Sequence, residues 1–368
     1  MVHTNLISIL KKETEFPQVT VLPDFFLDHF VIVEDLENLL NSIRRIAKQG
    51  GGNILGNTQF LRKGGNAMNT SSALLRLDVP AVPIVTTDAY GHRLLESLVE
   101  SSMDLSHIHT DGSLSATVSL EGDYEGRKAN VMISDSGSAK RFRYGDLTES
   151  DLEAIRESKM VVLVNLNHNS TAIELTENLF EFVRSESDAL TYLDIGDPSG
   201  RPDMVADLVD RILPSNLIDV LGVNENEVAW LFRALRGASS DWQEIVETPE
   251  RWLESAQILS KKMNCQIDLH TPFFSSSIRS SETVSVPSFK ITERTLCGAG
   301  DAWNAGNIYG LLNNLDSLDR LTIANAVAAI YVSSQDATHP SLNQVISFLE
   351  SNPDVSVHGT KLLKSAKG

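Results

Sequence analysis

Short apolar runs alternate along the chain with longer stretches whose apolar positions recur at helical spacing. The short runs favour strands buried on both faces of a sheet, and they lie at 19–23, 81–86, 160–166, 189–195 and 217–224. The amphipathic stretches predict helices at 35–48, 67–77, 92–102, 148–158, 203–212, 225–235, 249–263, 302–312, 318–333 and 342–351. Buried strands that alternate with helices predict an α/β fold with a mostly parallel sheet.

One segment, 113–145, breaks this rhythm. It alternates apolar and polar positions around Gly and Asp turns, which is typical of two or three antiparallel strands. A small sheet inserted into an α/β chain serves as a lid or a dimerisation flap, or it is a surface hairpin without function. The pattern leaves these alternatives open.

The composition is that of an ordinary globular chain, with 42% apolar residues, 22% charged residues and a formal charge of −18. No basic stripe offsets this charge, which argues against nucleic acid or an anionic membrane surface as the main partner but not against a small anionic ligand. Two cysteines, Cys265 and Cys297, give no disulfide framework and suit a reducing compartment. The start lacks a signal-peptide pattern and no apolar run could span a bilayer, so we expect a soluble cytoplasmic protein.

The glycine-rich segment 48–66 invites comparison with a dinucleotide-binding fingerprint. The frame fails, because Leu55 stands where the third glycine belongs and no predicted strand precedes the segment. The sequence therefore argues against an NAD-dependent dehydrogenase.

The stretch TLCGAGDAWNAG at 295–306 places two glycines and an aspartate where a helix is about to begin. Small residues at Gly298, Ala299 and Gly300 leave backbone amides uncovered at the positive end of that helix, which favours anion binding. A carboxylate next to a bound anion is repelled, so its position there indicates a functional role for Asp301. That role would be to take the proton of a hydroxyl that attacks a bound phosphate. The alternative is that the glycines only permit positive φ and Asp301 caps the helix.

Four segments, in the same order along the chain, resemble the ribokinase-like (phosphofructokinase-B) carbohydrate kinases. They are PDFFLDHFV (23–31) for the first strand, GGNAMNTSSALLRL (64–77) for the first signature, VNENEVAWL (223–231) for the N-x-x-E motif and GAGDAWNAG (298–306) for the second signature. The resemblance implies a single ribokinase-like domain, 1–368, with a three-layer α/β/α core and a mostly parallel sheet. It also implies a small antiparallel β lid built from segments near 29–63 and 113–145.

The resemblance further implies ATP-dependent phosphotransfer, with Mg²⁺, to a hydroxymethyl group of a sugar, sugar derivative or nucleoside. By position, Asp301 is the base, and the amides of Gly298, Ala299 and Gly300 stabilise the transferring group. The acceptor contacts are Asp28, Gly64, Gly65 and Asn69, the nucleotide and phosphate contacts are Asn224, Arg201, Thr271 and Asn325, and Mg²⁺ is organised through water by Glu227 and Asn224. A homodimer through the lid is compatible with the resemblance.

Some of these residues also have a purely structural interpretation. Asn224 and Glu227 read as a helix capping box, a role that is compatible with organising a metal. Arg201, in the turn after the strand at 189–195, either clamps phosphate oxygens or belongs to a plain turn. A buried Asp28 needs a partner, which a sugar diol supplies.

Two departures from the family pattern change the expectations. Thr295 stands where the family has an aspartate that helps hold an activating monovalent cation, which argues against potassium activation. The segment 266–281 lacks the glycines of the family's nucleotide-binding stretch, and its Phe273 and Phe274 either stack on a base or fill the groove. The alternative function is therefore a non-catalytic sugar- or nucleoside-binding protein on the same fold, and the sequence does not fix the acceptor.

Overall fold

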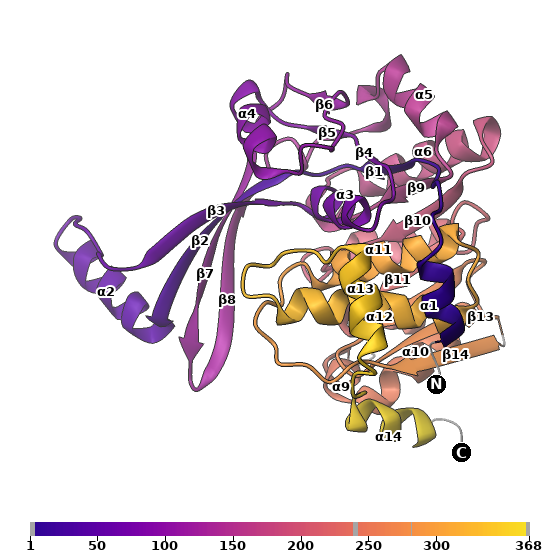
Figure 1. Ribbon diagram of the computed structural model, residues 1–368. Coiled ribbons are helices and arrows are strands. Elements are labelled where there is room, and N and C mark those ends of the chain that lie inside the picture. The colour runs from indigo at the N-terminus through magenta and orange to yellow at the C-terminus, as the bar shows by residue number, and fades with distance from the viewer. Residues whose placement is uncertain (1–3, 238–241, 281, 366–368) are drawn as a thin grey trace.

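The computed structural model describes residues 4–237, 242–280 and 282–365, and an eight-stranded sheet lies at its centre (Figure 1). The strands are β1 (Val19–Leu22), β4 (Ala81–Pro83), β9 (Met160–Leu163), β10 (Leu190–Asp194), β11 (Val220–Val223), β12 (Gln266–His270), β13 (Phe274–Arg279) and β14 (Glu282–Pro287). Their order is β14-β13-β12-β11-β10-β9-β1-β4. The neighbours from β12 to β4 are parallel, and β13 and β14 add an antiparallel edge. The predicted mostly parallel sheet is confirmed.

The sheet separates two apolar cores, because successive strand residues point to opposite faces. In β9, Met160 and Val162 belong to one core, whereas Val161 and Leu163 belong to the other. The first core is covered by α1 (Thr4–Leu10), α3 (Asn66–Arg76), α4 (Ala89–Leu98), α11 (Ala299–Leu312), α12 (Ser317–Ser333) and α13 (Leu342–Glu350). The second is covered by α5 (Glu149–Glu157), α6 (Ala172–Glu186), α7 (Pro202–Asp207), the π-helical turn Leu208–Ile212, α8 (Glu225–Arg236), α9 (Trp242–Glu247), α10 (Pro249–Ser260) and α14 (Val357–Ser365). The predicted three-layer α/β/α core is confirmed.

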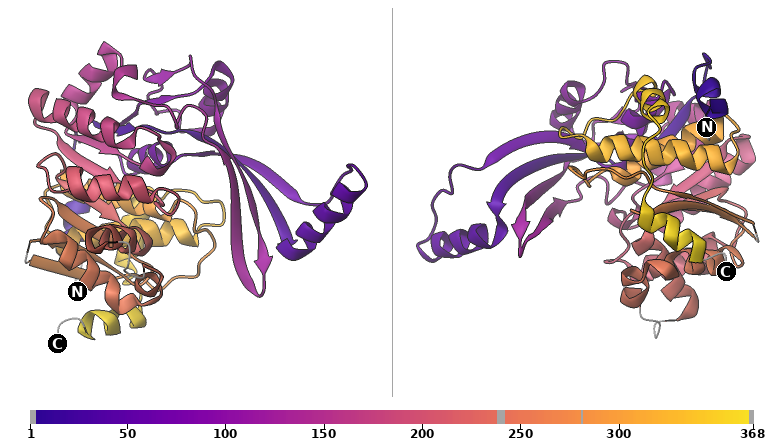
Figure 2. Two further views of the ribbon diagram at one scale, coloured as in Figure 1. Left: turned by 180° about the vertical axis from the view of Figure 1, so that it is seen from behind. Right: turned by 60° about the horizontal axis from the view of Figure 1, so that its bottom comes forward.

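A second, four-stranded sheet projects from one side of this core and forms the lid (Figure 2). Its strands are β2 (Phe26–Asp35), β3 (Thr58–Gly64), β7 (Ser115–Tyr124) and β8 (Arg127–Asp135), in the order β3-β2-β7-β8. The outer pairs are antiparallel, while β2 and β7 run parallel in the middle. α2 (Leu36–Lys48) lies at the far end and connects β2 to β3. The segment 113–145 is therefore joined to an earlier part of the chain and is not an isolated hairpin.

The remaining elements are short, and none of them alters this architecture. They are β5 (Val85–Thr86), β6 (Ile108–His109) and two 3₁₀ turns, Tyr144–Asp146 and Leu166–His168. Four helices, α1, α6, α9 and α14, and the strands β6 and β12 to β14 were not among the predicted elements, whereas each of the predicted helices and strands has a counterpart in the structure. Within the described residues, no helix is both long enough and apolar enough to cross a membrane.

Candidate active site

Helix α11 begins at a turn that requires glycine. Gly298 has a φ of 85°, and a Cβ at this position would lie 2.5 Å from the hydroxyl oxygen of Tyr331. The amide of Ala299 donates to the carbonyl of Leu296 at 3.1 Å. In the described part of the chain, the amides of Gly298 and Gly300 have no backbone acceptor. These free amides at the start of a 14-residue helix form a potential anion site.

Asp301 lies in the first turn of α11 and is only 5% exposed. Asn69 on α3 donates from Nδ2 to Oδ2 of Asp301 at 3.1 Å. Burial, and then the charge of Asp194, raise the pKa of Asp301 well above its usual value, while Asn69 and Lys63 act in the opposite direction. A carboxylate with a raised pKa accepts a proton more readily, as a general base requires.

Asp28 on β2 occupies space that a side chain at Gly64 would fill. A Cβ on Gly64 would lie 2.1 Å from Oδ2 of Asp28. Burial, followed by the charge of Asp24, raises the pKa of Asp28 to about 7, and Lys63 opposes the shift. Gly65 has a φ of 87°, and a Cβ there would lie 2.8 Å from the carbonyl oxygen of Asp24. The two glycines therefore allow the lid root and the start of α3 to approach each other.

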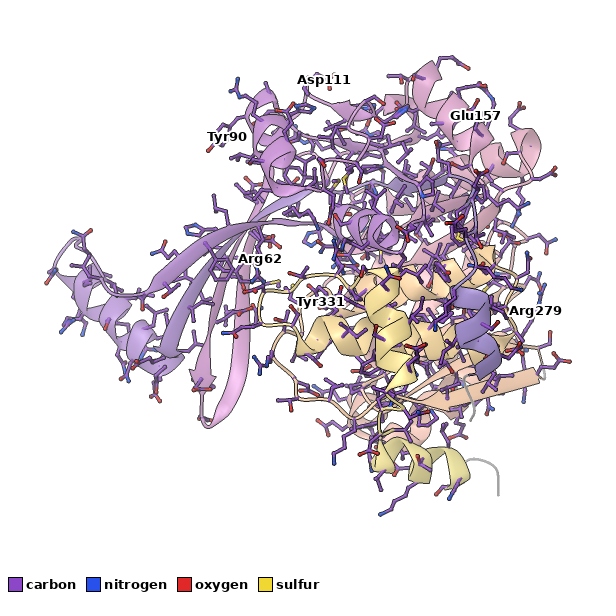
Figure 3. All side chains as sticks on the ribbon, viewed as in Figure 1. Arg62, Tyr90, Asp111, Glu157, Arg279 and Tyr331 are labelled. Carbon is purple, nitrogen blue, oxygen red and sulfur yellow. The ribbon has the colours of Figure 1, made fainter. Side chains whose placement is uncertain are left out.

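A cavity of about 210 Å³ lies between the root of the lid and the core. Figure 3 shows Arg62 at the lid side and Tyr331 on the facing core. The lining residues are Asp28, Phe30, Leu61, Arg62, Lys63, Asn69, Leu98, Glu121, Thr295, Cys297, Tyr331, Asp336, Ala337 and His339. Two of the predicted acceptor contacts, Asp28 and Asn69, thus line one cavity.

Sequence reasoning missed several residues of this region. Lys63 lies next to the recognised glycine pair, and that adjacency was a usable signal. Asp24, inside the recognised first-strand segment, accepts hydrogen bonds from the amides of Asn66 and Ala67 and so caps α3. His339, whose ring stacks on Tyr331 at 4.6 Å, had no signal, because its place in the cavity depends on tertiary packing.

Asn224 and Glu227 form the capping box expected at the start of α8. Asn224 Oδ1 accepts from the amide of Glu227, and the Glu227 carboxylate accepts from the backbone amide and Nδ2 of Asn224. Burial, and then the charge of Asp194, raise the pKa of Glu227 well above its usual value. Asp194 thus acts on both Glu227 and Asp301, so the three carboxyl groups belong to one electrostatic cluster.

The cluster fits a divalent cation held through water. Among the described residues, no group of three or more His, Cys, Asp or Glu side chains is arranged to hold a metal directly. Mg²⁺ usually keeps several waters and binds through one or two carboxylates together with substrate phosphates. Mutually repelling carboxyl groups at Glu227 and Asp194 suit that mode, because a cation would relieve their repulsion.

The other predicted nucleotide contacts already have partners within the protein. Arg201 donates from Nη1 to the carbonyl of Asn169 at 2.8 Å. Thr271 closes a turn by donating from Oγ1 to the carbonyl of Phe274. Asn325 is 4% exposed, and its Oδ1 accepts from Ser275 and Trp303. The structure does not bring Asn325 to the cavity described above.

The two phenylalanines of the glycine-free segment pack against other side chains of the protein, and Phe273 is only partly buried. Phe274 is 1% exposed, and Phe273 stacks on Trp252 with ring centroids 5.8 Å apart. The ring of His358 on α14 meets Phe273 edge-on at 4.5 Å. With Trp252 against its face and His358 at 4.5 Å, Phe273 fills space in the fold.

Thr295 ties together two loops at the edge of the cavity. Its Oγ1 donates to the carbonyl of Ser334 at 3.1 Å, and its backbone amide donates to the carbonyl of Val332 at 3.1 Å. A neutral hydroxyl therefore makes a direct bond between these loops.

Comparison with known proteins agrees with this fold. A family model described as pfkB family carbohydrate kinase matches residues 38–344. The fold resembles Arabidopsis thaliana ribokinase complexed with ribose and ATP (18% identity, TM-score 0.67, covering 92% of this chain and 99% of that one). It also resembles adenosine kinase from Sinorhizobium meliloti (12%, TM-score 0.65, 92% and 100%) and fructokinase with bound ATP from Xylella fastidiosa (12%, TM-score 0.62, 91% and 98%). No curated protein sequence matches the chain. Because the family model covers most of its length, the chain belongs to the pfkB family of carbohydrate kinases.

Proposed function

We propose that the protein transfers the γ-phosphoryl group of ATP to a hydroxymethyl group of a sugar, sugar derivative or nucleoside. The observation that carries the proposal is the position of Asp301, which follows the free amides of Gly298 and Gly300 and is bonded to Asn69 at the acceptor cavity. This places a base and an anion site within one helical turn. Phosphoryl transfer needs little more than such positioning and charge stabilisation.

In the proposed reaction, Asp28 and Asn69 hold the acceptor through its hydroxyl groups. Asp301 takes the proton of the acceptor hydroxyl while the oxygen of that hydroxyl bonds to the γ-phosphorus. The bond from that phosphorus to the bridging oxygen breaks, and ADP leaves with the bonding electron pair. The amides of Gly298 and Gly300 stabilise the charge on the transferring group.

Mg²⁺, when bound, would neutralise charge on the donor phosphates, and Glu227 with Asn224 would hold its waters. Glu227 would act from the first turn of α8 without leaving its capping position. Arg201 and Thr271 remain candidate phosphate contacts. Both would have to share or exchange their present protein partners.

The test is a phosphotransfer screen of sugars and nucleosides against several nucleotide donors, with Asp301→Asn as the blank. The variant keeps the shape of the side chain and its bond to Asn69 but cannot accept the proton. We expect kcat to fall about 10²–10⁴-fold, the usual contribution of a general base. Turnover within about tenfold of wild type would refute the assigned role.

A second candidate function is a non-catalytic sugar or nucleoside binder, favoured by the buried Phe274 and the partly buried Phe273 in the glycine-free segment. Thermal unfolding separates the two candidates. A kinase is stabilised by Mg²⁺-nucleotide at concentrations well above Kd, whereas a pure sugar binder responds to the sugar alone.

We also propose that two copies associate through the face of the lid that carries His29. A row across the four strands of the lid consists of Leu61, His29, Val118 and Ile133, each paired with the next. The three apolar side chains, Leu61, Val118 and Ile133, are 44%, 36% and 62% exposed. An exposed apolar row of this kind suits a second copy of the same surface. Ile133→Lys should shift a dimer to monomer in sedimentation; an unchanged mass would exclude this face.

A further inference from the structure

Lys63 is the penultimate residue of β3, just before the glycine pair, and it lies outside the segments that resemble the family. Its Nζ donates to Oδ1 of Asn69 at 3.5 Å, and Nδ2 of Asn69 donates to Asp301 at 3.1 Å. A single chain of contacts therefore runs from the root of the lid through α3 to the first turn of α11.

The chemistry of the amide gives this chain a direction. Asn69 offers one acceptor oxygen and one donor nitrogen, and an ammonium group can only donate. With Lys63 on one side, the oxygen of Asn69 must face the ammonium, so the nitrogen is directed at the carboxylate of Asp301. Without Lys63, only the bond to Asp301 would oppose rotation of the amide by half a turn, which would set oxygen against oxygen.

The charges around Asp301 give Lys63 a second effect. Asp301 interacts electrostatically with five titratable groups: Asp24, Lys63, Asp194, Cys297 and Tyr331. Burial raises the pKa of the Cys297 thiol to about 12, and burial likewise raises that of the Tyr331 phenol, so both stay neutral. Asp24 and Asp194 oppose ionisation of Asp301, and Lys63 is the cation that favours it.

Lys63 itself is held by the same cluster. Burial lowers the pKa of its ammonium group, while Glu100, Asp301 and Asp28 act against that shift. The ammonium group of Lys63 is therefore a positive charge shared by Asp28 at the lid root and by Glu100 and Asp301 in the core.

We propose that Lys63 is a positioning residue for Asp301: acting through Asn69, it orients the carboxylate of the base and keeps it ionised at the pH of catalysis. The inference rests on the proposed function, because it assigns a partner to the base of that reaction. It predicts an effect on the pH profile that a purely structural residue, or a simple acceptor contact, would not have.

The experiment is the pH dependence of kcat at saturating donor and acceptor for the wild type, Lys63→Met and Lys63→Arg. Lys63→Met keeps the length of the stem and removes the charge, and methionine tolerates burial, so we expect a folded protein. In Lys63→Met the acid limb, which is the low-pH part of the profile where kcat rises with pH, should move up by about one pH unit. At acidic pH kcat should then be about tenfold below that of the wild type, and it should recover toward the wild-type value in alkaline buffer. Lys63→Arg should keep the wild-type limb.

Arg62 provides a matched control for charge. It precedes Lys63 on β3 and lines the same cavity, but its guanidinium lies over the rings of Phe30 and Phe60, 5.3 Å and 4.6 Å from their centroids. Arg62→Met should leave the position of the acid limb unchanged, whatever it does to acceptor binding.

The outcomes separate this inference from the proposed function. If Asp301→Asn abolishes turnover but Lys63→Met leaves the acid limb in place, the positioning role is wrong. A loss of kcat that is equal at every pH, or a change in acceptor KM alone, would also overturn it. If Asp301→Asn turns over like the wild type, the proposed function itself fails.

Discussion

The interior of the protein holds an ion pair, Arg320–Asp268, whose loss should be costly. Arg320 on α12 is 2% exposed and Asp268 on β12 is 0% exposed. The guanidinium makes two bonds to the carboxylate, at 2.6 Å and 3.3 Å, donates to Ser277 at 2.8 Å and contacts Asn307. We predict that Arg320→Met lowers the free energy of unfolding by about 3–5 kcal/mol, the range for removing one partner of a buried pair.

The magnitude follows from what the substitution leaves behind. Asp268 would keep its charge in the core, and Ser277 would lose its charged donor. Replacing both members, as in Arg320→Met with Asp268→Leu, removes the uncompensated charge. The double variant should therefore cost at least about 2 kcal/mol less than the sum of the single variants, a coupling typical of contacting charges.

The assay is urea unfolding of the wild type, both single variants and the double variant, followed by fluorescence of the four tryptophans. Burial acts to raise the pKa of Asp268, but Arg320 holds it below the usual value, so the stabilisation is present at neutral pH and lost in acid. In Arg320→Met only hydrogen bonds from neutral groups, such as that from Asn307, still offset burial of Asp268. Protonation of Asp268 then relieves the uncompensated charge, so the loss of stability should shrink as pH falls. A single-variant cost under about 1 kcal/mol, or additive variants, would refute this reasoning.

Three further predictions concern the site. Gly65→Ala should destabilise the fold by about 1–3 kcal/mol in urea unfolding, because φ is 87° and the new Cβ meets backbone at 2.8 Å, whereas Gly145→Ala, with nothing within 4 Å, should stay within about 0.5 kcal/mol. Acceptor affinity measured by calorimetry should rise from pH 6 to 8 as Asp28 ionises around its pKa of about 7, and Asp28→Asn should flatten the profile; a pH-independent wild type would contradict it. Because Thr295 bonds directly to Ser334, replacing potassium by sodium or choline should leave kcat within about twofold; a larger loss would show a cation requirement.

The sequence predicted the central strands because they are buried on both faces and therefore read as unbroken apolar runs. Strand β13 escaped that criterion. Its serines, Ser275, Ser276 and Ser277, are buried yet polar, and their hydroxyl groups find partners on other elements, such as Ser285 on β14 and Asn325 on α12. No pattern along the chain shows that these hydroxyl groups are hydrogen-bonded, so the sequence did not predict this strand.

The candidate site shows the same limit. Asp301 and Asn69 were identified because each lies in a short motif with glycines whose conformational role is local, and Asp28 because its segment resembles the family's first strand. Tyr331 lies in the last turn of α12, and His339 lies in the loop that follows this helix. Both line the cavity only because α12 packs beside α11. Residues brought in by packing of distant segments carry no signature of their own.

The division of the acceptor contacts between two parts of the molecule has a thermodynamic consequence. Asp28 and Lys63 lie at the root of the projecting sheet, whereas Asn69 and Asp301 belong to the helical layer. A ligand that bonds to both sets binds more tightly to one orientation of the sheet than to others. Binding therefore shifts the sheet toward that orientation, and a change in the sheet's orientation alters the affinity by the same free energy. Substitutions far out on β2 or α2, which touch no ligand, would then change how tightly the acceptor is held.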